Sequence, residues 1–462
     1  MPATAEAAVQ LLLPLLSLIY SLAVHIFLSS FNERSLLKFQ HWHPILIRAV
    51  FFCVCVTFLR FISGRAEGNT SNDNGGDQNE AGVLFIPLAF VTTILSTKFI
   101  VQTRQIEING PQPPPVSTLN ESSPLNQDNV ILITGANSGI GLENTRLLYH
   151  QYKFTVILAC RSKARAMEAM KSIDPSWSEC PRHNNNNNKS GSGAIRFVSR
   201  MHFLPLDLTS IQSIHTAVKI FLEEMKMPLH VLINNAGVML NERMETVDGL
   251  EMTMAANHLG HFLLTNLLLP KLRETALNGK HPTKVITVSS SLYTNALRPR
   301  RNNQNQTTKK WNNEPGIDLL DLQCQIKPYR LFEQYAQSKL ANILFARELG
   351  RREKLQHGGL VQSHALHPGL VRTNVTRNMP WYLYYPNLVF SLFMMMLQKS
   401  PQCGAYTSVY CAVTEQEESD DSCYFVNSKK QPLETLALSD EEGRKLWKVS
   451  CQLMSLPLEK ES

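Results

Sequence analysis

Three long apolar runs occupy the first hundred residues of the chain. Leu11–Leu28 contains only three polar residues, Ile45–Ile62 contains two arginines near its ends, and Gly82–Val101 is apolar almost throughout. A membrane-spanning helix needs about 20 mostly apolar residues, so the first and third runs qualify. The second is either a third span whose arginines snorkel to the headgroups or a re-entrant or interfacial helix.

The charges between the runs predict an orientation. No Lys or Arg precedes the first run, which argues against a cleaved signal peptide. Arg34 and Lys38 lie in the first loop, the second loop is acidic, and Lys98 and Arg104 follow the second loop. The positive-inside rule then places everything after the third run on the cytosolic side. We expect a protein of the endoplasmic reticulum membrane with a catalytic domain facing the cytosol.

Composition divides the rest of the chain. Residues 1–104 form the predicted transmembrane region with two to three spans, and the proline-containing stretch 105–128 predicts a stiff linker. Residues 129–462 form the predicted soluble domain. Two segments inside it, around Asn184–Asn188 and Ala296–Pro315, are rich in asparagine and predict inserted surface loops.

From Val130 onward, apolar runs of strand length alternate with amphipathic stretches of helix length. This alternation predicts an α/β fold with a Rossmann-type, doubly wound parallel sheet. A final helix around Gly443–Trp447 is expected to pack on the sheet. The predicted strands are Val130–Thr134, Phe154–Cys160, His202–Leu206, His230–Asn234, Lys284–Ser289 and Ser363–Leu366.

Charge and cysteine content exclude some function classes. The chain has 45 Lys and Arg against 38 Asp and Glu, a mild formal net charge of +7 that does not indicate nucleic-acid binding. The nine cysteines show no CxxC and no regular spacing. Reduced thiols are therefore expected, as in a domain that faces the cytosol, and neither a metal site nor a disulfide framework is predicted.

The first predicted strand runs into a glycine-rich turn. Its residues from Thr134 to Gly141 read T-G-A-N-S-G-I-G. Glycines in such a turn let the backbone approach a diphosphate, and the next helix directs its N-terminal N–H groups at the anion. The pattern predicts a dinucleotide site, although glycines also occur in such turns for packing alone.

A series of motifs in order makes the chain resemble the short-chain dehydrogenase/reductase family over about residues 128–455. After the glycine turn, the series consists of Asp207, Asn234-Asn235-Ala236-Gly237, Asn257, Ser290, Tyr335-x-x-x-Lys339 and His367-Pro368-Gly369. The resemblance implies a nicotinamide-dependent enzyme that interconverts an alcohol and a carbonyl. It assigns cofactor binding to Gly135, Asn137, Ser138, Gly139, Ile140, Gly141, Arg161, Asp207, Asn235, Ala236, Gly237, Tyr335, Lys339, Pro368, Gly369, Val371 and Thr373.

The resemblance also implies catalytic roles. Tyr335 is the acid-base, Lys339 grips the nicotinamide ribose, Ser290 polarises the carbonyl, and Asn257 helps to hold a relay water. Ser290 is the second of three adjacent serines, any of which could instead cap the strand end. Lys339 shares a helix face with Tyr335, and a charge about 4 Å away at a dielectric near 20 is worth roughly 4 kcal/mol. We therefore expect the pKa of Tyr335 to fall by about three units.

The cofactor choice is made after the second predicted strand. An NAD enzyme typically has an acid there for the ribose 2′-hydroxyl. This chain has Arg161, followed by Lys163 and Arg165. Arg161 can fork onto a 2′-phosphate, and cations at a helix start oppose its dipole. NADP(H) is predicted, with NAD(H) left open.

The substrate is expected to be lipophilic. Several segments resemble the retinol-dehydrogenase-like group, and Pro228–Met239 resembles an X-chromosome-encoded polyprenol dehydrogenase more closely. Met379–Leu397 is rich in Met and aromatic residues, which suits a large apolar ligand, an ordinary core or a helix that rests on the membrane. A catalytically silent membrane scaffold and a steroid-type oxidoreductase are the alternatives. Membrane lipid is an expected partner, and the oligomeric state is open, a homodimer included.

Overall fold

The structure is a computed structural model, and it describes six stretches of the chain. They are residues 110–115, 129–178, 199–297, 316–371, 398–415 and 423–457. The chain divides into two compact units, Met1–Thr103 and Arg104–Ser462, and the described residues all belong to the second. The three apolar runs, the asparagine-rich insert around residue 186 and Met379–Leu397 lie outside them. Within the described stretches, no helix has the length and apolar character needed to cross a bilayer.

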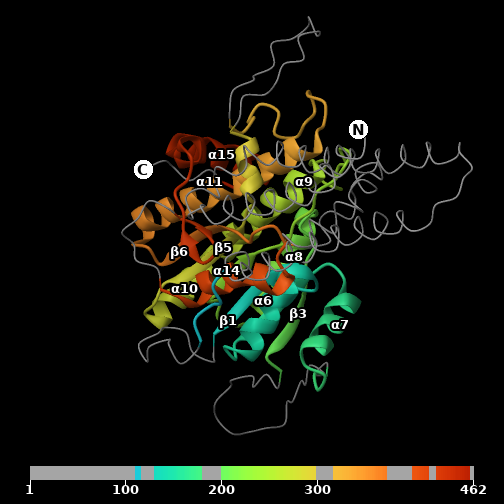
Figure 1. Ribbon diagram of the computed structural model, residues 1–462, viewed down its shortest axis with the longest axis vertical. Coiled ribbons are helices and arrows are strands. Elements are labelled where there is room, and N and C mark those ends of the chain that lie inside the picture. Colours follow the sequence, from blue (N-terminus) through green and yellow to red (C-terminus); the bar gives the residue numbers. More distant parts are fainter. Residues whose placement is uncertain are drawn as a thin grey trace, which may run out of the picture. The chain divides into compact units, whose positions relative to one another are not determined.

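A twisted sheet forms the centre of the second unit (Figure 1). Its strand order is β3-β2-β1-β4-β5-β6-β7-β8, parallel except for β8. The predicted α/β fold with a parallel sheet is confirmed, and the six predicted strands match within two residues at each end. The strands are β1 (Val130–Thr134), β2 (Thr155–Cys160), β3 (Met201–Pro205), β4 (Val231–Asn234), β5 (Thr283–Val288), β6 (Val361–His367), β7 (Tyr424–Val426) and β8 (Lys429–Lys430).

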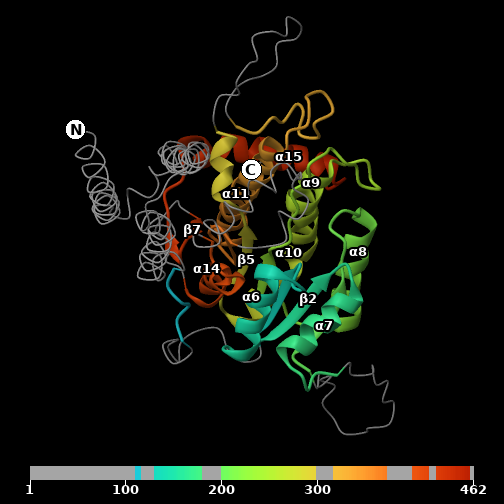
Figure 2. The same ribbon diagram turned by 45° about the vertical axis from the view of Figure 1, so that its right-hand side comes forward.

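Helices cover both faces of the sheet (Figures 1 and 2). On one face lie α6 (Gly139–His150), α7 (Lys163–Ile173) and α14 (Pro401–Val413). On the other lie α8 (Ile211–Lys219), α10 (Gly260–Gly279) and α11 (Leu331–His357). Shorter turns are η3 (Ile220–Met225), α9 (Met252–Met254), η4 (Ala255–Leu259), η5 (Ser291–Asn295) and η7 (Thr435–Leu438).

Side-chain alternation along β1 builds two separate cores. Val130 and Leu132 join the α8–α10–α11 side, whereas Ile131 and Ile133 join the α6–α7–α14 side. All four are buried, as is usual for a parallel strand covered on both faces. This explains why the strand appears in the sequence as a continuous apolar run.

The closing helix α15 (Asp440–Leu453) packs differently from the sequence-based expectation. We expected it to pack on the sheet, but its main partner is α11. The Trp447 ring lies edge-on to Phe262 at 4.9 Å between centroids and stacks on Phe345 at 5.9 Å. The sheet face is already covered by α10 and α11, so α15 forms an outer layer.

The described part of the predicted linker, residues 110–115, packs on this unit. Pro113 is buried, and the Tyr152 hydroxyl donates to the Pro114 carbonyl oxygen at 2.5 Å. A Cβ added to Gly110 would lie 3.3 Å from Asn427 Oδ1, in the turn between β7 and β8. These six residues are therefore part of the folded unit.

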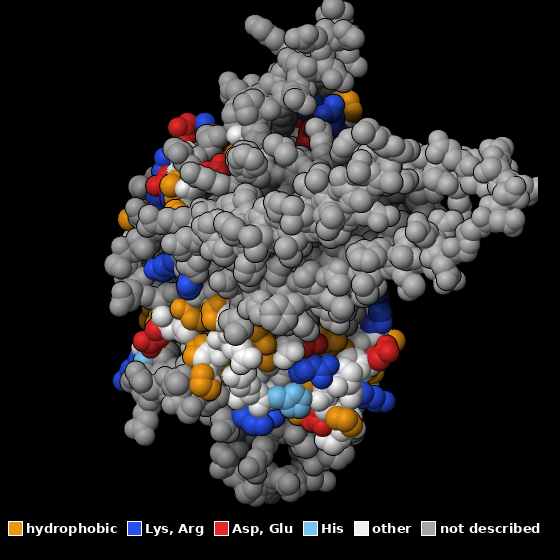
Figure 3. All heavy atoms as spheres, in the orientation of Figure 1, with side chains coloured by type: hydrophobic (Ala, Val, Ile, Leu, Met, Phe, Trp, Pro, Cys, Tyr) orange, Lys and Arg blue, Asp and Glu red, His pale blue; other side chains and the backbone are white. Residues whose placement is uncertain are grey.

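Lys, Arg, Asp and Glu side chains are interspersed on the described surface seen in Figure 3. No large area of one sign is visible on that face. This agrees with the mild net charge of the chain.

Candidate active site

The glycine turn lies between β1 and α6, where the strand order reverses between β1 and β4. This switch point is where open parallel sheets bind ligands. Gly135 and Gly139 have φ of +65° and +55°, which favour glycine. A Cβ on Gly141 would lie 2.4 Å from the Gly135 carbonyl oxygen, so the turn closes onto the helix only without a side chain. Ser138 is the N-cap of α6 and makes no side-chain cap bond, and the first turn of the helix carries no acid.

The loop after β4 is fastened to this turn. Thr134 Oγ1 accepts the backbone N–H groups of Asn235 and Ala236 at 2.9 and 3.0 Å. The Asn235 side-chain amide donates to the Thr134 carbonyl at 2.9 Å. A Cβ on Gly237 would lie 3.5 Å from Lys339 Nζ, so Gly237 borders the predicted catalytic lysine. The two predicted cofactor motifs are therefore joined directly by hydrogen bonds.

Asn257 is fully buried in the π-helical turn η4. Its Oδ1 accepts Val238 N–H at 2.7 Å, and its Nδ2 donates to the Val238 carbonyl and to Ser338 Oγ at 2.9 and 3.0 Å. Both amide hydrogens are thus used within the protein. The amide therefore joins the loop after β4 to α11, and the relay water at Asn257 stays a prediction.

Ser290, Tyr335 and Lys339 lie together at the carboxyl end of β5. Tyr335 accepts or donates a hydrogen bond with Ser290, and Lys339 Nζ is 5.5 Å from the Tyr335 ring centroid. Ser289 points elsewhere, because its hydroxyl donates to the Lys339 carbonyl at 2.7 Å. Of Ser289 and Ser290, Ser290 is therefore the one that contacts the tyrosine.

The expected fall in the pKa of Tyr335 is wrong, because the structure raises this pKa. Burial raises it to about 12, and the hydrogen bond with Ser290 opposes that rise. Burial also lowers the pKa of Lys339 to about 8. The lysine donates to the Val288 carbonyl at 3.0 Å instead of approaching the phenol oxygen closely, so desolvation outweighs charge attraction.

Arg161 follows β2 with its side chain 65% exposed. Its Nη1 is 3.7 Å from Asp207 Oδ2, and Asp207 Oδ1 accepts Thr209 N–H and Oγ1–H at 3.0 and 2.7 Å. Asp207 thus orients the guanidinium without burying it. Ser162, the N-cap of α7, accepts Arg165 N–H at 3.4 Å.

His367 is the last residue of β6, and the loop after it carries Pro368, Gly369 and Val371; Thr373 lies outside the described residues. Gly369 has φ of +93°, and a Cβ there would lie 2.6 Å from Lys399 Cε. Sequence reasoning missed Lys399, which is buried and donates to Asn427 Oδ1 at 2.6 Å. Burial, then Lys399, then Lys339 lower the pKa of His367 to about 3.

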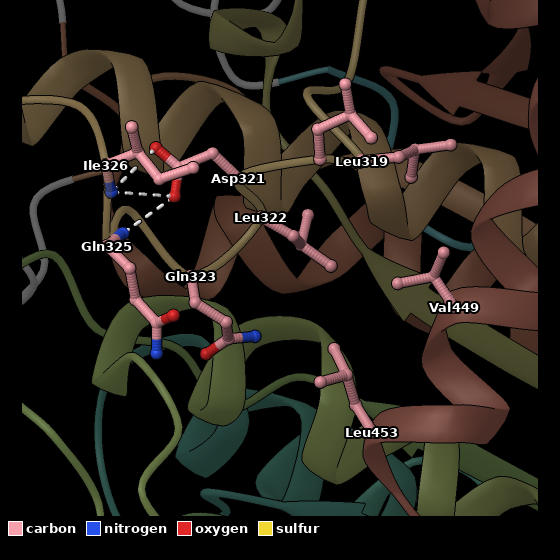
Figure 4. Close-up of a pocket in the computed structure, with 9 residues that line it drawn as sticks. Leu319, Asp321, Leu322, Gln323, Gln325, Ile326, Val449 and Leu453 are labelled. Atoms are coloured by element: carbon pink, nitrogen blue, oxygen red, sulfur yellow. Dashed lines mark hydrogen bonds between the residues drawn. The ribbon is translucent and has the colours of Figure 1, made fainter.

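A small hollow lies apart from this group (Figure 4). It has a volume of about 160 Å³ and lies between the loop around Leu319–Ile326 and Val449 and Leu453 of α15. None of the predicted catalytic residues lines it. It plays no part in the assignment of the site.

Comparisons with known proteins agree with this geometry. A family model described as short chain dehydrogenase matches residues 182–299. Human retinol dehydrogenase 11 is 36% identical over 333 residues, which cover 71% of this chain and 87% of that protein. The chain belongs to the short-chain dehydrogenase/reductase family. Within it, the chain is placed in the retinol-dehydrogenase-like group.

Other relatives extend the match. Human retinol dehydrogenase 14 is 36% identical over 329 residues, covering 71% of this chain and 86% of that protein. Mouse retinol dehydrogenase 12 is 35% identical over 379 residues, covering 82% of this chain and all of that protein. A solved structure from Mycobacterium paratuberculosis is 28% identical with a TM-score of 0.47, over 71% of this chain and 95% of that one. As a member of this family, the chain is an oxidoreductase that acts on alcohol groups.

The residues present fit the nicotinamide dinucleotide that such oxidoreductases use. Gly135, Gly139 and Gly141 leave the turn without side chains, and the first turn of α6 has no acid to repel a diphosphate. Gly237 has no side chain beside Lys339 Nζ, which an added Cβ would approach to 3.5 Å. The glycine turn would hold the diphosphate, and Lys339 would hold the nicotinamide ribose.

Proposed function

We propose that this protein is an NADP(H)-dependent oxidoreductase of the endoplasmic reticulum membrane, with its catalytic domain facing the cytosol. Its substrate is a lipophilic alcohol, of retinoid or polyprenoid type, and the corresponding aldehyde or ketone. The observation that carries the proposal is the group of Ser290, Tyr335 and Lys339 beside the glycine turn. A catalytically silent scaffold is the alternative, and this intact group argues against it.

The side chains divide the proton chemistry among them. When bound, NADP(H) supplies or takes up the hydride at the carbon of the substrate. Tyr335 is protonated near neutral pH because its pKa is raised, so it can donate a proton to a carbonyl oxygen. Ser290, which hydrogen-bonds with the phenol, is placed to polarise the same oxygen. The ammonium of Lys339 favours the phenolate that forms after proton transfer.

Arg161 supports the choice of NADP(H). A 2′-phosphate is an anion that a guanidinium binds through two parallel hydrogen bonds. Arg161 is exposed, held by Asp207, and followed by Lys163 and Arg165 in a first helical turn without an acid. Cations there oppose the dipole of α7, and a bound phosphate would offset that cost.

The lipophilic substrate is supported by the relatives. Proteins named retinol dehydrogenases are 34–36% identical to this chain, and retinol is a lipophilic alcohol. The apolar runs before residue 104 would keep the enzyme at the bilayer in which such a substrate dissolves. A steroid would also meet this description, so the substrate panel below includes one.

The test is kcat/KM for NADPH and NADH on microsomes that contain the full-length protein, with retinal, a polyprenal and a ketosteroid. We expect turnover of retinal or the polyprenal and a preference for NADPH. Arg161→Asp should weaken or invert that preference, whereas Lys171→Asp, the same charge change in the last turn of α7, should preserve it. A wild type that prefers NADH would contradict the cofactor assignment. Turnover of the ketosteroid alone would contradict the substrate assignment.

A further inference from the structure

His261 connects two parts of the site that are far apart in the sequence. It lies in the first turn of α10, 1% exposed. Its Nε2 is 2.8 Å from Thr134 Oγ1, at the end of β1. Its Nδ1 is 3.1 Å from the carbonyl oxygen of Asn257, in the π-helical turn before α10.

These two contacts determine the tautomer of His261. A carbonyl oxygen can only accept, so Nδ1 carries the hydrogen and donates it to Asn257. The Nε2 of the neutral ring then accepts the hydroxyl hydrogen of Thr134 at 2.8 Å, a shorter contact than the 3.4 Å between that hydroxyl and the Ile233 carbonyl oxygen. This leaves both Thr134 lone pairs free for the Asn235 and Ala236 N–H groups, which they accept at 2.9 and 3.0 Å. Both ring nitrogens and the hydroxyl are therefore fully used.

The hydrogen bonds continue on both sides of His261. On one side, Thr134 holds the loop after β4 against the glycine turn. On the other, Asn257 donates to Ser338 Oγ at 3.0 Å, and the Ser338 hydroxyl donates to the Tyr335 carbonyl at 2.8 Å. A continuous path thus joins the cofactor turn to the helical turn that carries the catalytic tyrosine.

We propose that His261 is a positioning residue. It holds the glycine turn after β1 at a fixed distance from η4, which carries Asn257, and from α11, which carries Tyr335. Its Nε2 contact with Thr134 governs the affinity for the dinucleotide, and its Nδ1 contact with Asn257 governs turnover. This inference rests on the proposed function, because it takes Tyr335 as the proton donor and the turn after β1 as the cofactor site. Hydride transfer from the cofactor and proton transfer from Tyr335 need the cofactor site and the tyrosine to be correctly placed relative to each other.

A second buried histidine provides a matched control. His258 lies three residues earlier, is also 1% exposed, and has its Nε2 3.1 Å from Ser450 Oγ in α15. Burial lowers its pKa to about 4, as burial lowers that of His261 to about 3. Ser450 belongs to the outer helix layer, and Asn342 of α11, the other side chain with which His258 hydrogen-bonds, also lies outside both motif loops. A purely structural role for buried histidines predicts the same loss at both positions.

The experiment separates the two contacts of His261 in full-length protein purified in detergent. In His261→Asn, the side-chain amide can replace the Nδ1 donor, so the Asn257 contact is kept. In His261→Gln, the side-chain oxygen can replace the Nε2 acceptor, so the Thr134 contact is kept. NADPH fluorescence titration without substrate gives Kd, and turnover of the best panel substrate at saturating NADPH gives kcat.

We expect His261→Asn to raise the Kd for NADPH about tenfold with kcat largely kept, since one hydrogen bond is worth about 1.4 kcal/mol here. His261→Gln should lower kcat about tenfold with Kd largely kept. His258→Gln should lower the melting temperature and change neither constant. Two His261 variants with the same pattern, or a pattern equal to that of His258→Gln, would overturn the inference.

Thr134 provides a second route if the His261 variants do not fold. Thr134→Val keeps the volume and removes the hydroxyl, so it should raise Kd like His261→Asn, and Thr134→Ser should restore it. An unchanged Kd in Thr134→Val would overturn the inference independently. A wild type that binds NADPH without turning over any substrate would instead refute the proposed function, and with it the kcat half of this proposal.

Discussion

Gly141→Ala should damage both the fold and the cofactor site. The added Cβ would lie 2.4 Å from the Gly135 carbonyl oxygen, 3.0 Å from its carbonyl carbon and 2.6 Å from Asn235 Nδ2. Two of these are backbone atoms at the centre of the glycine turn, so the turn itself has to move. Overpacking of this kind costs about 1–3 kcal/mol of unfolding free energy.

Displacement of the turn should also weaken NADPH binding about tenfold or more, which corresponds to about 1.4 kcal/mol. Thermal unfolding and NADPH titration of the purified protein measure the two effects. Gly279→Ala is the control: it is an exposed helical glycine with nothing within 4 Å of the added Cβ, and it should be neutral or stabilising. Wild-type melting temperature and Kd in Gly141→Ala would refute the reasoning.

Two further predictions concern pH and topology. Burial lowers the folded-state pKa of five histidines below the ordinary 6.5, to about 4 for His202 and His258 and about 3 for His261, His364 and His367. The unfolded chain therefore binds more protons than the folded one below pH 6.5. The free energy of unfolding should fall by up to about 1.4 kcal/mol per histidine for each pH unit, until the pH reaches the folded-state pKa. A melting temperature unchanged between pH 7.5 and 5.5 would contradict this. In intact microsomes, protease should remove a C-terminal tag, and the glycosylation triplet Asn69-Thr70-Ser71 should lie on the lumenal side. A protected tag, together with glycan on the triplet Asn305-Gln306-Thr307, would reverse the predicted orientation.

Much of the fold could be predicted because strands that are buried on both faces appear in the sequence as continuous apolar runs. The apolar runs of β1 and β4 stand out between polar stretches, and the glycine turn and the Asn235-Ala236-Gly237 motif follow them directly. The strands β7 and β8 were missed because three and two residues are too short for any periodicity. Lys284 shows that a contact between distant residues cannot be predicted from the sequence pattern. It lies within a predicted apolar strand, and its ammonium donates to the Thr414 carbonyl at the end of α14, at 2.6 Å and 130 residues away.

The residues of the candidate site could be predicted from the sequence, but their hydrogen bonds, burial and pKa values could not. The sequence spacing places Lys339 on the helix face of Tyr335, but it cannot show that the ammonium turns to Val288 and that burial dominates both pKa values. Asn257 is similar, since its bonds to Val238 and Ser338 depend on how two distant loops meet. His261 was visible one helical turn after Asn257, whereas Lys399 left no signal in the sequence.

The measurement that tests the central claim most directly is turnover in Tyr335→Phe. The substitution removes only the phenol oxygen, so the ring packing and the cofactor turn should persist. We predict that NADPH still binds with a Kd close to that of the wild type, while turnover of the best substrate is abolished because no group remains to donate the proton. Near-wild-type turnover in Tyr335→Phe would remove this tyrosine as the acid-base and contradict the account.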